Sequence, residues 1–121
     1  MQRLWLTTAL VVCFFSSPQA LAATPLVVEA ALDRQVVAPL LAAFEQAHPG
    51  IELSYRDRST LEVNALTAAA DPPPDVVISS AMPWQMNRVN QGYAQRLDSE
   101  LANEWPEWAK WRNEVFGFTF E

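Results

Sequence analysis

The sequence predicts an α/β protein, an open parallel-sheet lobe that is covered by helices. Three short β-prone segments, residues 26–31, 51–56 and 75–78, alternate with segments of helical periodicity. The connections between them are short, and the first and third strands are too apolar to face water on either side. A β-α-β-α-β-α order of this kind is typical of parallel strands packed against helices.

Residues 1–22 have the three parts of a secretory signal peptide. Arg3 gives a positive start, residues 4–15 are largely apolar, and Ala20-Leu21-Ala22 is an A-x-A cleavage site. The apolar run is shorter than the roughly 20 residues that cross a bilayer. We therefore expect export to the periplasm with cleavage after Ala22 and no membrane insertion of the mature chain, residues 23–121.

The charge and cysteine content exclude several classes of protein. The chain has 8 Lys and Arg against 14 Asp and Glu, a net charge of −6, and no basic stripe that would attract nucleic acid. Its one cysteine, Cys13, would leave with the signal peptide, so the mature chain has no disulfide and no thiolate metal site.

The first strand, residues 26–31, is followed by a segment of helical periodicity that contains a proline, Pro39. Asp33 can cap a helix, but Pro39 disfavours helix at the residue before it. We expect a short turn over residues 33–38 and a regular helix that begins near Pro39. His48-Pro49-Gly50 carries the usual stop signals.

The second and third helices follow strands 51–56 and 75–78. Ser59 or Thr60 can start a helix that runs through residue 70, and Ser59 with Glu62 has the spacing of a capping box. The third helix is predicted over residues 82–91, closed by Gly92 at the position after its C-cap.

The last residues alternate like a strand with one buried face. Residues 116–120 read FGFTF, and Glu121 follows with no turn or polar tail. We expect residues 23–121 to be an incomplete N-terminal α/β lobe of a longer protein.

Polar residues follow each predicted strand, where ligands bind in open α/β sheets. The strand-to-helix corners contain Asp33, Ser59 with Thr60, and Ser79 with Ser80. Helix starts with unpaired N–H groups can hold an anion, and hydroxyls add donors and acceptors. The same residues are also ordinary N-caps. Trp84, in the first turn of the third helix, is a candidate for lining the cleft.

Several stretches give the chain a family resemblance. They are ALDRQVVAPLLAAFEQAHPGIEL, RSTLEV, DVVISSAMPWQMNRVNQGYAQ and PEWAKWRNEVFGFTFE. Together they resemble periplasmic solute-binding proteins of ABC importers, the type II group, and within it the iron(III)-type proteins and their organic-phosphate-binding relatives. The resemblance covers residues 26–121.

The resemblance implies a non-enzymatic protein of two α/β lobes that closes on a small solute and delivers it to an ABC permease in the inner membrane. It implies a monomer, and a ferric ion or an anionic, organic-phosphate-like solute as cargo. Two departures bear on the cargo. Glu29-Ala30 replaces the Tyr-Ser that members often have, and no early histidine matches the iron ligand of ferric binders.

Two other functions remain as alternatives. The same fold can act as a periplasmic sensor that reports its ligand to a membrane receptor kinase. A secreted hydrolase is more distant, because Ile78 and Ala81 flank the serines where a G-x-S-x-G elbow needs glycines. Neither a phosphate-binding loop nor a dinucleotide fingerprint is present, so the sequence predicts no cofactor. His48 lacks the converging partners of a metal site.

Overall fold

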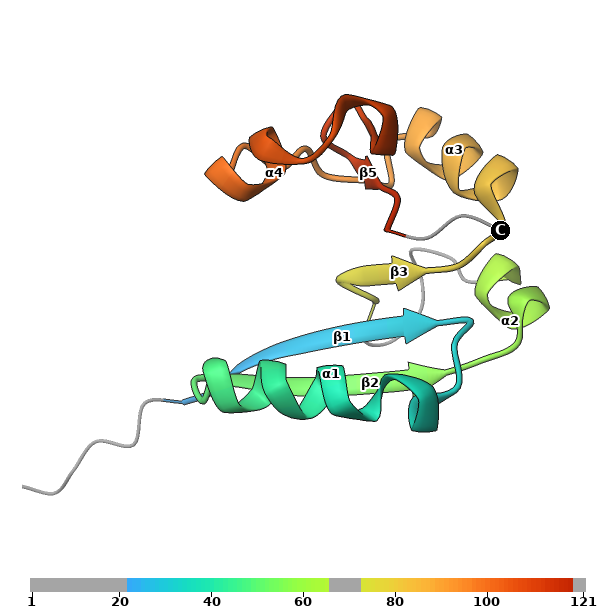
Figure 1. Ribbon diagram of the computed structural model, residues 1–121. Coiled ribbons are helices and arrows are strands. Elements are labelled where there is room, and N and C mark those ends of the chain that lie inside the picture. Colours follow the sequence, from blue (N-terminus) through green and yellow to red (C-terminus); the bar gives the residue numbers. More distant parts are fainter. Residues whose placement is uncertain (1–21, 66–72, 119–121) are drawn as a thin grey trace, which may run out of the picture.

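A three-stranded parallel sheet forms the centre of the molecule. The computed structural model describes residues 22–65 and 73–118. The strands β1 (Thr24–Ala30), β2 (Ile51–Asp57) and β3 (Val76–Ile78) lie in the order β2-β1-β3, all parallel (Figure 1). The predicted α/β class with a parallel sheet is therefore confirmed, and the first strand is central because both neighbours pair with it.

Helix α1 (Arg34–Ala47) covers one face of this sheet. Val28, Ala30 and Tyr55 form the buried cluster on that face, and Val37 and Leu41 of α1 pack against it. The residues between them, Val27 and Glu29, alternate to the opposite face, as the two-residue period of a strand requires.

The predicted start of α1 near Pro39 was wrong. The helix begins at Arg34 and Pro39 lies inside it. Asp33 supplies the reason, because its carboxylate accepts a hydrogen bond from the Gln35 N–H and so nucleates the first turn. Pro39 is exposed, and the carbonyl that its missing N–H leaves unpaired can therefore be solvated by water.

The next elements agree more closely with the sequence pattern. Helix α2 is described over Thr60–Ala65, and the rest of the helix predicted to residue 70 lies outside the described residues. Helix α3 spans Met82–Asn90. Gly92 follows it with φ 84°, and the N–H of Tyr93 donates to the Arg88 carbonyl at 3.1 Å. This Schellman arrangement confirms the predicted role of Gly92.

The last described part consists of short elements. Helix α4 (Glu100–Glu104) and a 3₁₀ turn η1 (Glu107–Ala109) precede an antiparallel pair, β4 (Lys110–Trp111) and β5 (Val115–Phe116). The strand predicted over 116–120 was misplaced, because β5 ends at Phe116 and residues 119–121 lie outside the described part. The indole N–H of Trp105 donates to the Gly117 carbonyl at 3.0 Å and so links the end of α4 to the residue after β5.

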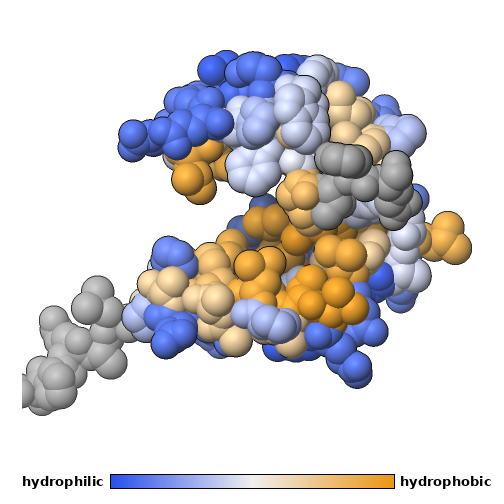
Figure 2. Space-filling model, in the orientation of Figure 1, coloured by the Kyte–Doolittle hydropathy of each residue, from blue (hydrophilic) through white to orange (hydrophobic). Residues whose placement is uncertain are grey.

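The ribbon view shows two parts of the molecule, one above the other (Figure 1). The lower part is the sheet with α1, and the upper part is the segment from α3 to β5. The space-filling view shows a notch between them and apolar side chains around α1 (Figure 2). Val36 and Leu40 on α1 are 75% and 69% exposed. The apolar residues of α1 are thus only partly covered by the described residues.

Candidate functional site

The three strand-to-helix corners lie at one edge of the sheet. All three arrows point the same way (Figure 1), so the segments after β1, β2 and β3 emerge together. Two backbone hydrogen bonds join the strand ends, from the Arg58 N–H to the Ala30 carbonyl at 2.9 Å and from the Ala31 N–H to the Ile78 carbonyl at 2.8 Å. The topology thus places Asp33, Ser59, Thr60, Ser79 and Ser80 at the edge where ligands bind in open α/β sheets.

The start of α1 is closed by two carboxylates. Asp33 accepts from the Gln35 N–H at 2.7 Å, and Asp57 accepts from the Arg34 N–H at 3.3 Å. Tyr55 steadies the loop by donating its hydroxyl to the Leu32 carbonyl at 2.9 Å. Burial, together with the charge of Asp57, raises the pKa of the Tyr55 hydroxyl, which keeps it a donor. Asp33 therefore caps and positions this corner, and its own charge discourages an anion there.

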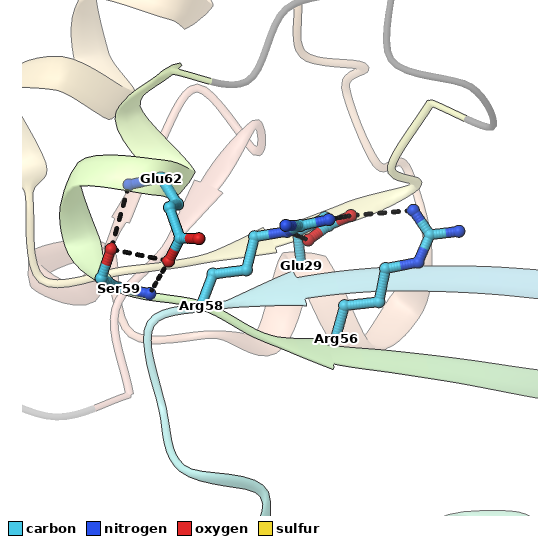
Figure 3. Close-up of polar contacts among 5 residues, drawn as sticks. All are labelled: Glu29, Arg56, Arg58, Ser59 and Glu62. Atoms are coloured by element: carbon cyan, nitrogen blue, oxygen red, sulfur yellow. Dashed lines mark hydrogen bonds and ion pairs between the residues drawn. The ribbon is translucent and has the colours of Figure 1, made fainter.

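The start of α2 is closed by the predicted capping box (Figure 3). The Glu62 carboxylate accepts from the Ser59 N–H at 2.8 Å and from its hydroxyl at 2.7 Å, and the Glu62 N–H donates to the Ser59 hydroxyl at 3.3 Å. Donation by the Ser59 N–H, and then by its hydroxyl, lowers the pKa of Glu62. Ser59 is thus occupied by its own helix, whereas Thr60, the first residue of α2, is exposed.

The start of α3 lacks a side-chain cap, although the Met82 N–H donates to the Ser80 carbonyl at 2.8 Å and Pro83 has no N–H to offer. The N-cap residue is Ala81, which has no side chain to cap with, and Ser79 accepts from the Ala81 N–H at 3.1 Å. The side-chain amide of Gln85 donates to the Ser79 carbonyl, so α3 is hydrogen-bonded to the corner that precedes it. Ser80 is exposed. Its hydroxyl has no hydrogen-bond partner in the described part of the chain, so it can face a solute.

Trp84 lies in the first turn of α3, as the sequence predicted, and it has a partner, Arg88, that the sequence analysis did not name. It is half-buried, and the Arg88 guanidinium lies 5.2 Å from its ring centroid and 5.2 Å from that of Tyr93. Such cation–π geometry holds the indole and brings a positive charge to the same helix. The i, i+4 spacing of Trp84 and Arg88 could have suggested this contact.

An apolar groove of about 700 Å³ lies against the other side of α3. Its walls come from α3 and from the segment that includes η1, β4 and β5. The main lining residues are Met82, Met86, Trp105, Trp108, Trp111 and Phe118. Trp105 also packs edge-on against Phe116, with ring centroids 6.2 Å apart. The groove therefore begins two residues after Ser80 but does not include Trp84.

Glu29 is the residue that sequence reasoning undervalued. Its carboxylate is buried in β1 and is bound by Arg56 and Arg58 (Figure 3). The available signal was a single carboxylate inside the apolar run LVVEAA, because a buried charge requires a partner. The identity of that partner depended on strand pairing, which places Arg56 directly across from Glu29.

Comparison with known proteins then decides the family. The family model described as bacterial extracellular solute-binding protein matches residues 29–121. The chain belongs to this family. The comparison with curated proteins gave no match.

A solved structure supports the assignment of this solute-binding chain. It is the substrate-binding protein of an ABC transporter from Agrobacterium tumefaciens, with 35% sequence identity and a TM-score of 0.69. The match covers 78% of the present chain and 29% of that protein. The chain therefore spans under a third of the length of this relative.

Two further observations concern the described residues of this solute-binding chain. No helix among them is long and apolar enough to cross a membrane. Within residues 22–65 and 73–118, no group of three or more His, Cys, Asp or Glu side chains is arranged to hold a metal ion. The side chains gathered at the carboxyl edge are instead hydroxyls, arginines and carboxylates that are bonded to backbone N–H groups or to arginines.

Proposed function

We propose that this chain is the N-terminal part of a periplasmic substrate-binding protein that captures a small anionic solute, such as an organic phosphate, for an ABC permease. Residues 1–22 would direct export and be removed. The solute would bind at the carboxyl edge of the β2-β1-β3 sheet, and a second lobe would close over it.

One observation carries this proposal. Parallel strands bring three helix starts to a single edge, and the start of α3 lacks a side-chain cap on its N-cap residue. A helix N-terminus carries a partial positive charge that favours negative groups. Ser80 adds a hydroxyl that is exposed and can donate to a solute.

An anion is favoured over a ferric ion by the chemistry of this edge. Ferric sites use anionic oxygen and imidazole ligands, yet the carboxylates of Asp33, Asp57 and Glu62 are already bonded to backbone N–H groups. The described part of the chain places no further His or acidic cluster there. Hydroxyls and arginines suit a phosphate or carboxylate better.

The test is a thermal-shift screen of the full-length secreted protein with phosphate esters, carboxylates, polyols, amines and ferric ion. Binding to the folded state raises the melting temperature by linkage. We expect a phosphate ester or carboxylate to give the largest shift. A shift confined to ferric ion or to neutral solutes would contradict the proposal.

A matched pair of variants then locates the site. Ser80→Ala should reduce the shift given by the winning solute, because an exposed donor is lost. Ser99→Ala removes a serine that caps α4 through Ala102 and lies outside the three corners, so it serves as the control. An unchanged solute shift in Ser80→Ala would place the solute elsewhere.

A further inference from the structure

A buried carboxylate occupies the middle of the molecule. Glu29 is 1% exposed although it stands on the central strand β1. Burial of an unpaired charge is very unfavourable, so such a group is kept only with partners. Arg56 donates to Glu29 Oε1 at 2.9 Å, and Arg58 donates to both carboxylate oxygens (Figure 3). Glu29 thus orients two arginines at once.

These three side chains lie on the face of the sheet that α1 does not cover. Residues of β1 and β2 alternate between faces, and α1 packs with Val28, Ala30 and Tyr55. Glu29 and Arg56 stand opposite each other on the two strands, one position further on from Val28 and Tyr55. Arg58 directly follows β2 and precedes Ser59, at the edge where the corners gather. The cluster therefore reaches the proposed solute edge.

The three charged groups of this cluster differ in their exposure to solvent. The carboxylate is covered, whereas the side chains of Arg56 and Arg58 remain 30% and 34% exposed. Burial by itself would raise the pKa of Glu29, but hydrogen bonds from Arg58 and Arg56 and their charges outweigh it and lower the pKa. Glu29 is therefore ionised at neutral pH, and the trio carries one net positive charge that faces outward.

The guanidinium groups retain donors for another partner. Glu29 uses one N–H group of Arg56 and one each from the Nε and Nη2 positions of Arg58. The remaining N–H groups of both side chains donate to no described residue. The charge of Glu62 also acts on Arg58, but its carboxylate is hydrogen-bonded to Ser59 rather than to these arginines. Arginine forks held in a fixed orientation bind phosphate and carboxylate well.

We infer that Arg56 and Arg58 form an anion-binding site, oriented by Glu29, that receives the phosphate or carboxylate group of the solute. This inference rests on the proposed capture of an anionic solute and adds the residues that recognise its charge. Glu29 is a positioning residue in this site, because it would contact the arginines and not the solute.

The experiment is calorimetric titration of the full-length protein with inorganic phosphate and, separately, with acetate, at constant ionic strength. Arg56→Gln should weaken binding of the preferred anion about tenfold, the loss expected for one hydrogen bond to a charged group. The comparison between the two anions tells whether the site takes a phosphate or a carboxylate. Arg96→Gln, which changes an exposed arginine paired with Asp98, is the control and should leave binding unchanged.

A double variant guards against loss of folding. Arg58→Gln alone leaves Glu29 with one partner fewer, whereas Arg58→Gln with Glu29→Gln replaces a charged pair by two amides and leaves no buried charge. This double variant should fold and should also bind the anion about tenfold more weakly. The conservative Arg58→Lys keeps the charge but loses the fork, so it should restore only part of the affinity.

Two outcomes would overturn the inference. One is a wild-type protein that binds neither phosphate nor acetate, and the other is wild-type affinity in both Arg56→Gln and the double variant. If the solute found by the thermal-shift screen binds these variants as it binds the wild type, the arginine site is wrong and the proposed capture function stands. If the screen finds no anionic solute, the proposed function itself fails.

Discussion

The β2–α2 and β3–α3 corners both contain serine but differ in their chemistry. Both place serine between a strand and a helix, yet Ser59 is enclosed by Glu62 in a capping box, whereas Ser80 is exposed beside an N-cap alanine. The difference follows from one residue, because Glu62 stands three positions after Ser59 and no carboxylate follows Ser79 or Ser80 at that spacing.

The two helix starts therefore differ in the donors that they leave for a ligand. A capping box satisfies two N–H groups internally, here those of Ser59 and Glu62, which stabilises the helix and leaves fewer donors for an anion. A start without a side-chain cap leaves the helix dipole available. We therefore expect the capped start of α2 to contribute mainly to stability, and the start of α3, together with Arg56 and Arg58, to contribute mainly to binding. Three measurements test this division.

The largest effect on stability is expected from Val63, the buried side chain of α2. Val63 is 0% exposed and is the buried residue of that helix. Val63→Ala should lower the free energy of unfolding by about 2 kcal/mol, because it removes two buried methyl groups and leaves a cavity. Urea denaturation measures the change. Leu61→Ala, at a position that is 80% exposed on the same helix, is the control and should change it by less than about 0.5 kcal/mol.

A smaller effect is expected from the caps themselves. Ser59→Ala should lower the free energy of unfolding by about 1 kcal/mol, the usual cost of a lost N-cap. Ser79→Ala removes a single acceptor from the Ala81 N–H and should lower it by less than about 0.5 kcal/mol, because such a serine turn is weak. Equal losses in the two variants, measured by the same denaturation, would remove the distinction between the corners.

The smallest effect on stability is expected from the protonation of Glu62 at acidic pH. The pKa of Glu62 is lowered below its ordinary value of 4.5 by hydrogen bonds from Ser59. Its stabilising contribution is therefore present above about pH 4.5 and is lost as the pH falls through the lower, folded-state value. Glu62→Gln should make the stability less dependent on pH below 4.5, as followed by thermal melts.

Glu29 also contributes to the dependence of stability on acidic pH, so this dependence should remain in part when Glu62 is replaced. The pKa of Glu29 is also lowered in the folded state, so it adds a loss of stability in the same direction as pH falls. The Glu62→Gln protein should keep part of the acid slope, and Glu62→Gln with Glu29→Gln should keep less. An acid profile identical to that of the wild type in Glu62→Gln would show that the ionisation of Glu62 contributes nothing to stability.

Local patterns predicted much of this molecule from sequence. The capping box at Ser59, the glycine after α3 and the alternation of strands and helices depend on neighbours within a few residues, and each was found where predicted. The start of α1 was misjudged because the local cost of Pro39 was weighed above the cap from Asp33. Propensity at one residue is a weak guide when the rest of the helix is well packed or capped.

The parallel α/β class and the residues at each corner could be predicted from periodicity and spacing, which are properties of neighbouring residues. The family was suggested by a resemblance and was shown by the family model that matches residues 29–121. The fold was needed to bring Asp57 to the start of α1 and to place Arg56 and Arg58 on Glu29. Those contacts join residues up to 29 positions apart, and strand order and register alone bring them together.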